Sequence, residues 1–92
     1  MALSKTIQPG TLVTVVSTKG KTAGIVMSTG QHNGLDIWES PGQIKVAVAI
    51  IGDTIVIIKG PRKVNGINLC RVKYNSIEGE MYWTELRSNC KI

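Results

Sequence analysis

Apolar and polar residues alternate in short runs along most of this 92-residue chain, and glycine, proline or asparagine separates the runs. Short alternating runs bounded by turn residues are typical of β-strands. We expect seven strands, in the ranges 11–17, 23–28, 35–39, 44–51, 54–58, 67–74 and 77–83. Residues 84–87 could add a single helical or 3₁₀ turn. The pattern therefore predicts an all-β fold, a small antiparallel barrel or sandwich of six or seven short strands.

The most apolar stretch runs from Ile44 to Ile58, where eleven of fifteen residues are apolar and Gly52-Asp53 interrupts the run. Strand-forming residues on both sides of such a pair predict a β-hairpin with a two-residue turn. The pairing puts five bulky residues on one face, which we expect in the core: Val46, Val48, Ile50, Ile55 and Ile57. The opposite face, called the flat face below, consists of Ala47, Ala49, Ile51, Val56 and Ile58.

The flat face needs a cover. If its large aliphatic side chains stayed in water, the fold would lose on the order of 5–9 kcal/mol of hydrophobic stabilisation. This loss is comparable to the stability of a whole domain. Residues 9–28 or 34–39 of the same chain could fold across it, or a second copy could cover it and form a homo-oligomer. The sequence leaves both covers open, so the flat face is a candidate oligomer or partner surface.

The net charge of +5 is concentrated, because residues 59–74 contain five basic residues and no acidic one. A candidate patch for nucleic acid or an acidic partner consists of Lys19, Lys21, Lys59, Arg62, Lys63, Arg71 and Lys73. Aromatic side chains near such a patch would stack on bases, and the possible contacts are Trp38, Tyr82 and Trp83. The alternative is a solvated loop that only keeps the protein soluble.

The length suits one domain over residues 1–92, with residues 1–8 as a possible loose N-terminal arm. The two cysteines, Cys70 and Cys90, are too few for a disulfide framework, although a single disulfide remains open. The first ten residues lack the apolar core of a signal peptide, so we expect a cytoplasmic protein. Because the apolar run from Ile44 is too short to span a bilayer, we expect no membrane segment.

Catalytic chemistry has little support in the sequence. The single histidine, His32, lies in a glycine-rich stretch, and a Cys-His pair with either cysteine has no supporting motif. Metal-ligand spacings and phosphate-binding glycine loops are also missing from the sequence. We therefore expect no enzymatic activity, no cofactor, no metal and no small-molecule substrate.

Two stretches resemble known families. Residues 9–27, PGTLVTVVSTKGKTAGIVM, resemble the KOW motif, with a strand, a Lys-Gly turn and a returning strand. Residues 34–86 resemble bacterial Src-homology-3 domains, in GLDI with Pro41-Gly42, in GDTIVIIKGP, in NG followed by CRVKYN, and in Gly79, Met81 and Leu86. These resemblances imply a single Src-homology-3-like barrel, and the KOW motif implies RNA or DNA binding.

The bacterial family commonly places tryptophans where this chain has Leu69, Cys70 and Glu80. A groove for proline-rich or cell-wall peptides needs exposed rings, so cell-wall binding is a distant third interpretation. We expect a non-catalytic protein-interaction or assembly module that associates with itself through the flat face. An accessory subunit, a phage-encoded factor and an assembly component all fit. The alternative is a KOW-like RNA- or DNA-binding module that uses the basic segment 59–73.

Overall fold

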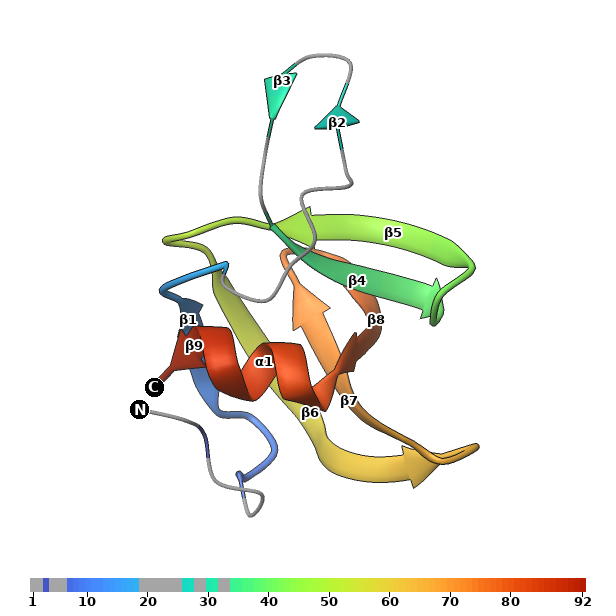
Figure 1. Cartoon of the computed structure of the whole chain (residues 1–92). Helices are drawn as coiled ribbons and strands as arrows, with labels where there is room; N and C mark the ends of the chain where they lie inside the picture. The colour runs from blue at the N-terminus through green and yellow to red at the C-terminus, as the bar shows by residue number, and fades with distance from the viewer. Residues whose placement is uncertain (1–2, 4–6, 19–25, 28–29, 32–33) are drawn as a thin grey trace.

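The structure is a computed structural model, and it describes residues 3, 7–18, 26–27, 30–31 and 34–92. The elements are β1 (Leu12–Val15), β2 (Val26–Met27), β3 (Gly30–Gln31), β4 (Leu35–Ser40), β5 (Ile44–Ala49), β6 (Thr54–Val64), β7 (Ile67–Tyr74), β8 (Ile77–Tyr82), α1 (Trp83–Asn89) and β9 (Cys90–Lys91). In Figure 1, α1 lies between β9 on one side and β8 on the other. Strands dominate, which confirms the all-β prediction.

Seven of the strands form one antiparallel sheet in the order β5-β4-β8-β7-β6-β1-β9, and β2 pairs with β3 separately. The sheet is not closed, because the strands at its two ends, β5 and β9, do not pair with each other. All seven predicted strands have a counterpart, in β1, β2, β4, β5, β6, β7 and β8, while β3 and β9 were not predicted. Hydrogen bonding does not complete a barrel within the described part of the chain.

The predicted strands 67–74 and 77–83 correspond to β7 and β8. Their alternation is regular, and the turn between them contains Asn75 at a φ of 56°. Asparagine tolerates this left-handed region better than most residues. The turn sets the register, so that Arg71 lies opposite Glu80 and Lys73 lies opposite Glu78.

The hairpin predicted over Ile44–Ile58 is wrong. The chain does turn there, because the Asp53 amide donates to the Ile50 carbonyl at 3.0 Å, but β5 pairs with β4 while β6 pairs with β1 and β7. The end of β1 occupies the turn: the Val15 amide donates to the Asp53 carbonyl at 2.9 Å, and the Gly52 amide donates to the Val15 carbonyl at 2.8 Å. Long-range pairing therefore replaces the local hairpin.

Loss of the hairpin divides the flat face between two strands that are not neighbours. Ala49 lies opposite Leu35 and Ala47 lies opposite Ile37, so both alanines point to the core side of β4. Ala49 is fully buried and Ile51 is 59% exposed, while Val56 and Ile58 are half-buried on β6. The flat face is therefore not a continuous surface, which corrects the predicted oligomer interface.

The bulky face is confirmed only in part. Ile55 and Ile57 are fully buried in the core, as expected. Val46 is partly buried against the core, and Val48 is half-buried. Ile50 is 40% exposed because it lies in the turn rather than in a paired strand.

β6 is longer than the sequence suggested, since it runs to Val64 and includes Gly60 and Pro61. We expected a basic loop there because proline cannot donate a ladder hydrogen bond. The strand accommodates this segment through two register shifts, one between Ile57 and Lys59 and one between Lys59 and Arg62. Bulges of this kind bend a strand and allow proline within it.

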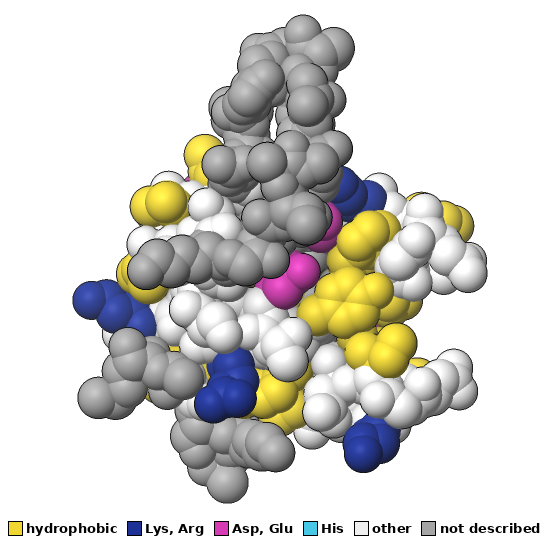
Figure 2. All heavy atoms as spheres, viewed as in Figure 1, with side chains coloured by type: hydrophobic (Ala, Val, Ile, Leu, Met, Phe, Trp, Pro, Cys, Tyr) yellow, Lys and Arg dark blue, Asp and Glu magenta, His cyan; other side chains and the backbone are white. Residues whose placement is uncertain are grey.

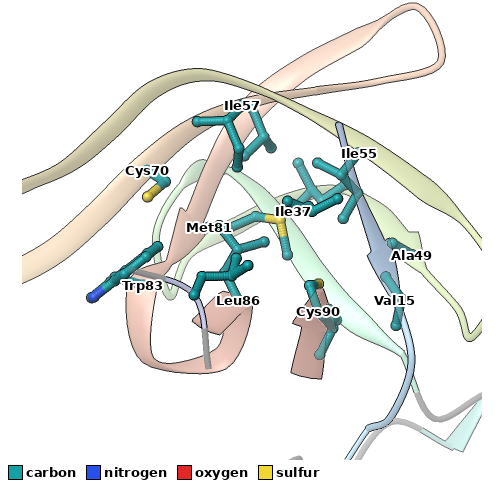
Figure 3. Close-up of a cluster of buried hydrophobic side chains, with 14 residues drawn as sticks. Val15, Ile37, Ala49, Ile55, Ile57, Cys70, Met81, Trp83, Leu86 and Cys90 are labelled. Atoms are coloured by element: carbon teal, nitrogen blue, oxygen red, sulfur yellow. The ribbon is translucent and has the colours of Figure 1, made fainter. Parts of the chain in front are cut away.

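The core lies between the sheet and α1. Figure 3 labels ten of its residues: Val15, Ile37, Ala49, Ile55, Ile57, Cys70, Met81, Trp83, Leu86 and Cys90. α1 is a seven-residue α-helix rather than a 3₁₀ turn, and it buries Trp83, Leu86 and Asn89. The Asn89 carbonyl accepts from the Val16 amide at 2.7 Å, and its side-chain oxygen accepts from the Ser17 hydroxyl at 2.6 Å. These bonds attach the helix to β1.

The N-terminal segment is not loose at the positions that the structure describes. Leu3 is only 7% exposed and belongs to the core cluster, and Ile7 packs against that cluster. The expected KOW-like hairpin falls partly outside the described residues, as do Lys19 and Lys21 at its tip. Of the expected returning strand, Val26–Met27 form β2. Within the described chain, none of the helical segments has the length and hydropathy needed to cross a membrane.

Candidate interaction surface

The outer face is the side of β4, β8, β7, β6 and β1 that points away from the core. Residues directly opposite each other in antiparallel strands share a face, so one row crosses four strands through Trp38, Glu80, Arg71 and Lys59. A second row consists of Tyr82, Leu69 and Arg62, and a third of Glu78, Lys73, Val56 and Leu12. The residues between these rows, such as Cys70, Val72 and Met81, point into the core.

Glu80 connects two arginines at the centre of the outer face. Its Oε1 accepts from Arg62 Nη2 at 2.8 Å and its Oε2 accepts from Arg71 Nη1 at 2.9 Å. Glu80 is only 7% exposed, and a buried carboxylate is stable only when it is paired. Arg71 also donates from Nε to Glu78 at 3.1 Å. These bonds, to Glu80 first and to Glu78 second, raise the pKa of Arg71.

This network explains how Lys59 and Arg71 can lie directly opposite each other. Like charges in this position repel, and the two carboxylates beside Arg71 offset the repulsion. The same contacts hold the guanidinium groups of Arg62 and Arg71 in place. Both groups already form ion pairs within the protein, so they are less available to a ligand than an unpaired cation would be.

The other end of the outer face is aromatic. The rings of Trp38 and Tyr82 meet edge to face, with centroids 6.2 Å apart and planes at 72°. Lys45 Nζ lies over the Trp38 ring, 5.7 Å from its centroid, and forms an ion pair with Asp36 at 3.1 Å. In Figure 2, hydrophobic side chains gather on the flank of the molecule over β4 and β8. Tyr82 and Lys45 therefore both contact the Trp38 ring, which is half-buried.

The turn between β4 and β5 supports Tyr82. Gly42 has a φ of 76°, which favours glycine. A Cβ atom at this position would lie 3.3 Å from the Tyr82 hydroxyl oxygen. Glycine therefore provides the backbone conformation of the turn and also leaves room for the Tyr82 side chain.

Two of the three expected aromatic contacts, Trp38 and Tyr82, are half-buried on the outer face. The prediction that the third residue, Trp83, offers an aromatic contact on the surface is wrong. Trp83 is 1% exposed and packs in the core, because β8 ends at Tyr82 and the helix begins at Trp83. A regular strand would have continued the alternation, whereas the helix turns this side chain inward.

The structure brings together four members of the predicted basic patch, which are Lys59, Arg62, Arg71 and Lys73. Lys63 is opposite Asn68 and therefore points to the other side of the β6–β7 ribbon. Lys19 and Lys21 lie outside the described residues. Lys59 and Lys73 are exposed and have no acidic partner in the described part of the chain, so they are the free cations of the outer face.

The cysteines are buried free thiols. Burial raises the pKa of Cys70 and of Cys90 to about 12, with the nearby Arg62 lowering and Glu80 raising the value for Cys70. A nucleophilic cysteine needs the thiolate, which neither residue forms near neutral pH. His32 lies outside the described residues, so the conceivable Cys-His pair is not placed. The described residues also contain no group of three or more His, Cys, Asp or Glu side chains suited to a metal ion.

Sequence reasoning missed Glu80, Glu78 and Leu12 as parts of this surface. A signal for the two glutamates was present, because Glu80 and Arg71 are equally far from the centre of the Asn75-Ser76 turn, as are Glu78 and Lys73. A two-residue hairpin turn pairs such positions. Leu12 had no comparable signal, because its exposure depends on the pairing of β1 with β6.

Comparisons with protein-family models, with curated proteins and with solved structures found no match for this chain. What the outer face can do follows from its own side chains. A fixed Arg–Glu–Arg network, an edge-to-face aromatic pair and two free lysines suit it to binding, and the described residues include no activated nucleophile beside a base.

Proposed function

We propose that this protein is a non-catalytic protein-interaction module and that the outer face is its contact surface. The row from Trp38 to Lys59 supports the proposal, because it places an aromatic side chain, an ion-paired centre and a free cation in order on one sheet face. Trp, Tyr and Arg most often contribute the binding energy of protein interfaces. Glu80 already holds Arg62 and Arg71 in place, so binding would cost little additional side-chain entropy.

The partner in this proposal is a different protein chain. Self-association through the flat face loses its basis, because that face is divided between β5 and β6. The sheet edges are poor alternatives. β5 carries Lys45 and two register shifts against β4, and β9 is only two residues long. Charges, bulges and short edge strands all oppose edge-to-edge pairing. We also place the protein in the cytoplasm, and its free thiols support a reducing compartment.

A KOW-like nucleic-acid module is the second candidate. The observation in its favour is that Lys59, Arg71 and Lys73 lie together on one face, where they could contact phosphates. Two observations favour the protein partner over it. Arg71 is already paired with Glu78 and Glu80, and the ring of Trp38 is already in contact with Lys45 and Tyr82. A surface for single strands normally offers free ring faces to the bases.

The test uses the purified full-length chain. Light scattering at low and at high salt measures the oligomeric state, and absorbance at 260 nm detects bound nucleic acid. We expect a monomer free of nucleic acid under both conditions. A nucleic-acid signal that salt releases would overturn the proposal in favour of the second candidate. A stable oligomer at both salt concentrations would contradict a separate partner chain and restore self-association.

A further inference from the structure

We propose that the partner presents an extended acidic segment with aliphatic side chains, and that this segment binds across β7, β6 and β1. This inference rests on the proposed function and names the chemistry of the partner. The surface concerned is the basic end of the outer face, defined as Lys59, Lys73, Val56 and Leu12. Val56 lies directly opposite Lys73 on one side and Leu12 on the other, so the four residues are contiguous.

The two free lysines have the spacing of alternate residues in an extended chain. Lys59 lies opposite Arg71, and Lys73 is two residues beyond Arg71 on the same strand and face. Diagonal neighbours of this kind are about 7–8 Å apart, and alternate residues of a strand are separated by about 6.6–6.8 Å. Carboxylates at alternate positions of an extended segment can therefore reach both ammonium groups. The net charge of +5 would also attract an acidic chain.

An aliphatic contact lies beside the lysines. Leu12 is 56% exposed and lies directly opposite the half-buried Val56. An aliphatic side chain of the partner would cover Leu12 while the carboxylates meet the lysines. None of the four residues that define the basic end is aromatic, so they offer no ring on which a base could stack. The combination of aliphatic and cationic side chains therefore favours an acidic protein segment over a single-stranded nucleic acid.

The ion pairs already present leave this site available. Glu80 is buried and engaged by Arg62 and Arg71, so it does not reach out to neutralise the exposed lysines. Glu78 lies opposite Lys73, but its carboxylate pairs with Arg71 at 3.1 Å. An incoming carboxylate can bind Lys59 or Lys73 without breaking the buried network.

The experiment measures fluorescence anisotropy of a labelled peptide whose alternate positions, which share one face in an extended chain, carry glutamate, glutamate and leucine, with serine at the positions between them. The comparison probes are the same peptide with glutamine for glutamate, a polyglutamate of equal charge, and an oligothymidine of equal charge. We expect the glutamate–leucine peptide to bind best. The double variant Lys59→Gln/Lys73→Gln should weaken binding by about tenfold or more, and Leu12→Ser should weaken it severalfold.

Lys63→Gln is the matched control, because Lys63 is an exposed lysine of the same strand that points to the other side of the ribbon. Circular dichroism and urea unfolding should show that all these surface variants remain folded. Equal losses from Lys63→Gln and from Lys59→Gln/Lys73→Gln, or tighter binding of oligothymidine or of polyglutamate, would overturn the inference. So would failure of the glutamate–leucine peptide to bind. The proposed function would survive these outcomes unless the scattering experiment also found bound nucleic acid or an oligomer.

Discussion

At the scale of single residues, Glu80 fixes the positions of the two arginine side chains at the centre of the outer face. It is a buried carboxylate in a strand that alternates regularly, and it holds one arginine from β6 and one from β7. The arginines reach it from different strands, so the contact also fixes how those strands lie beside β8. One acidic residue thus links the charge pattern of the surface to the packing of the sheet.

Replacing Glu80 by glutamine should lower the free energy of unfolding by about 1–3 kcal/mol, between the values for exposed and buried ion pairs. The reason is that Arg62 and Arg71 would both lose their shared carboxylate. Urea unfolding measures the change. Glu78→Gln is the matched control, because this side chain is 51% exposed and, among the residues that the structure describes, forms an ion pair only with Arg71. Equal losses for the two variants would show that burial of Glu80 has no special role.

At the scale of elements, the strands β5 and β6 do not pair with each other, although the local sequence predicts that they form a hairpin. Both are strands, as their β-branched residues predict, and a turn joins them at Ile50–Asp53. Their partners are nevertheless β4 on one side and β1 with β7 on the other. This arrangement buries Ala49 completely and leaves Val56 on the outer face.

The two positions should therefore respond differently to a charge. Ala49→Glu should destabilise the fold by about 3–5 kcal/mol, because it would place an unpaired carboxylate in the core. Val56→Glu should change stability by less than about 1 kcal/mol, since Lys73 lies directly opposite and can pair with it. Thermal and urea unfolding of both variants check this expectation. A folded Ala49→Glu variant with normal stability would contradict the pairing of β5 with β4.

At the scale of the whole molecule, one hydrophobic core contains residues from the sheet and from α1, together with Leu3 near the N-terminus. Both cysteines belong to it, and burial keeps their pKa at about 12. In the unfolded chain these thiols ionise at a lower pH. The hydrogen bond to Asp53 raises the pKa of Tyr74 in the same direction. The folded state therefore holds more protons than the unfolded state at alkaline pH.

This difference makes stability depend on pH. Each thiol makes its full contribution to the free energy of unfolding when the pH is below its pKa in the unfolded chain. This contribution is lost as the pH rises toward the pKa of the thiol in the folded protein. Between about pH 8 and about pH 10 the loss is on the order of 1 kcal/mol for each thiol. Tyr74 should add to the loss at still higher pH. Urea unfolding under reducing conditions, at neutral and at alkaline pH, measures the slope. Cys90→Ala should reduce the slope even though it also lowers the stability at neutral pH. An unchanged slope would contradict burial of this thiol.

The all-β class and the boundaries of β7 were predicted from the sequence. The Asn75-Ser76 turn also carries the register of β7 with β8, a signal that sequence reasoning missed. These features depend on neighbouring residues, namely regular alternation and a two-residue turn. The sequence also predicted Ile55 and Ile57 in the core and grouped Lys59, Arg62, Arg71 and Lys73 in one candidate patch, although it expected Lys59 and Arg62 in a loop rather than on β6. Tertiary packing, in contrast, decides that β5 pairs with β4, that Trp83 turns inward, and that Glu80 forms ion pairs with both Arg62 and Arg71. Those outcomes depend on packing and hydrogen bonds between segments far apart in the chain, where long-range pairing competes with the local hairpin signal and replaces it.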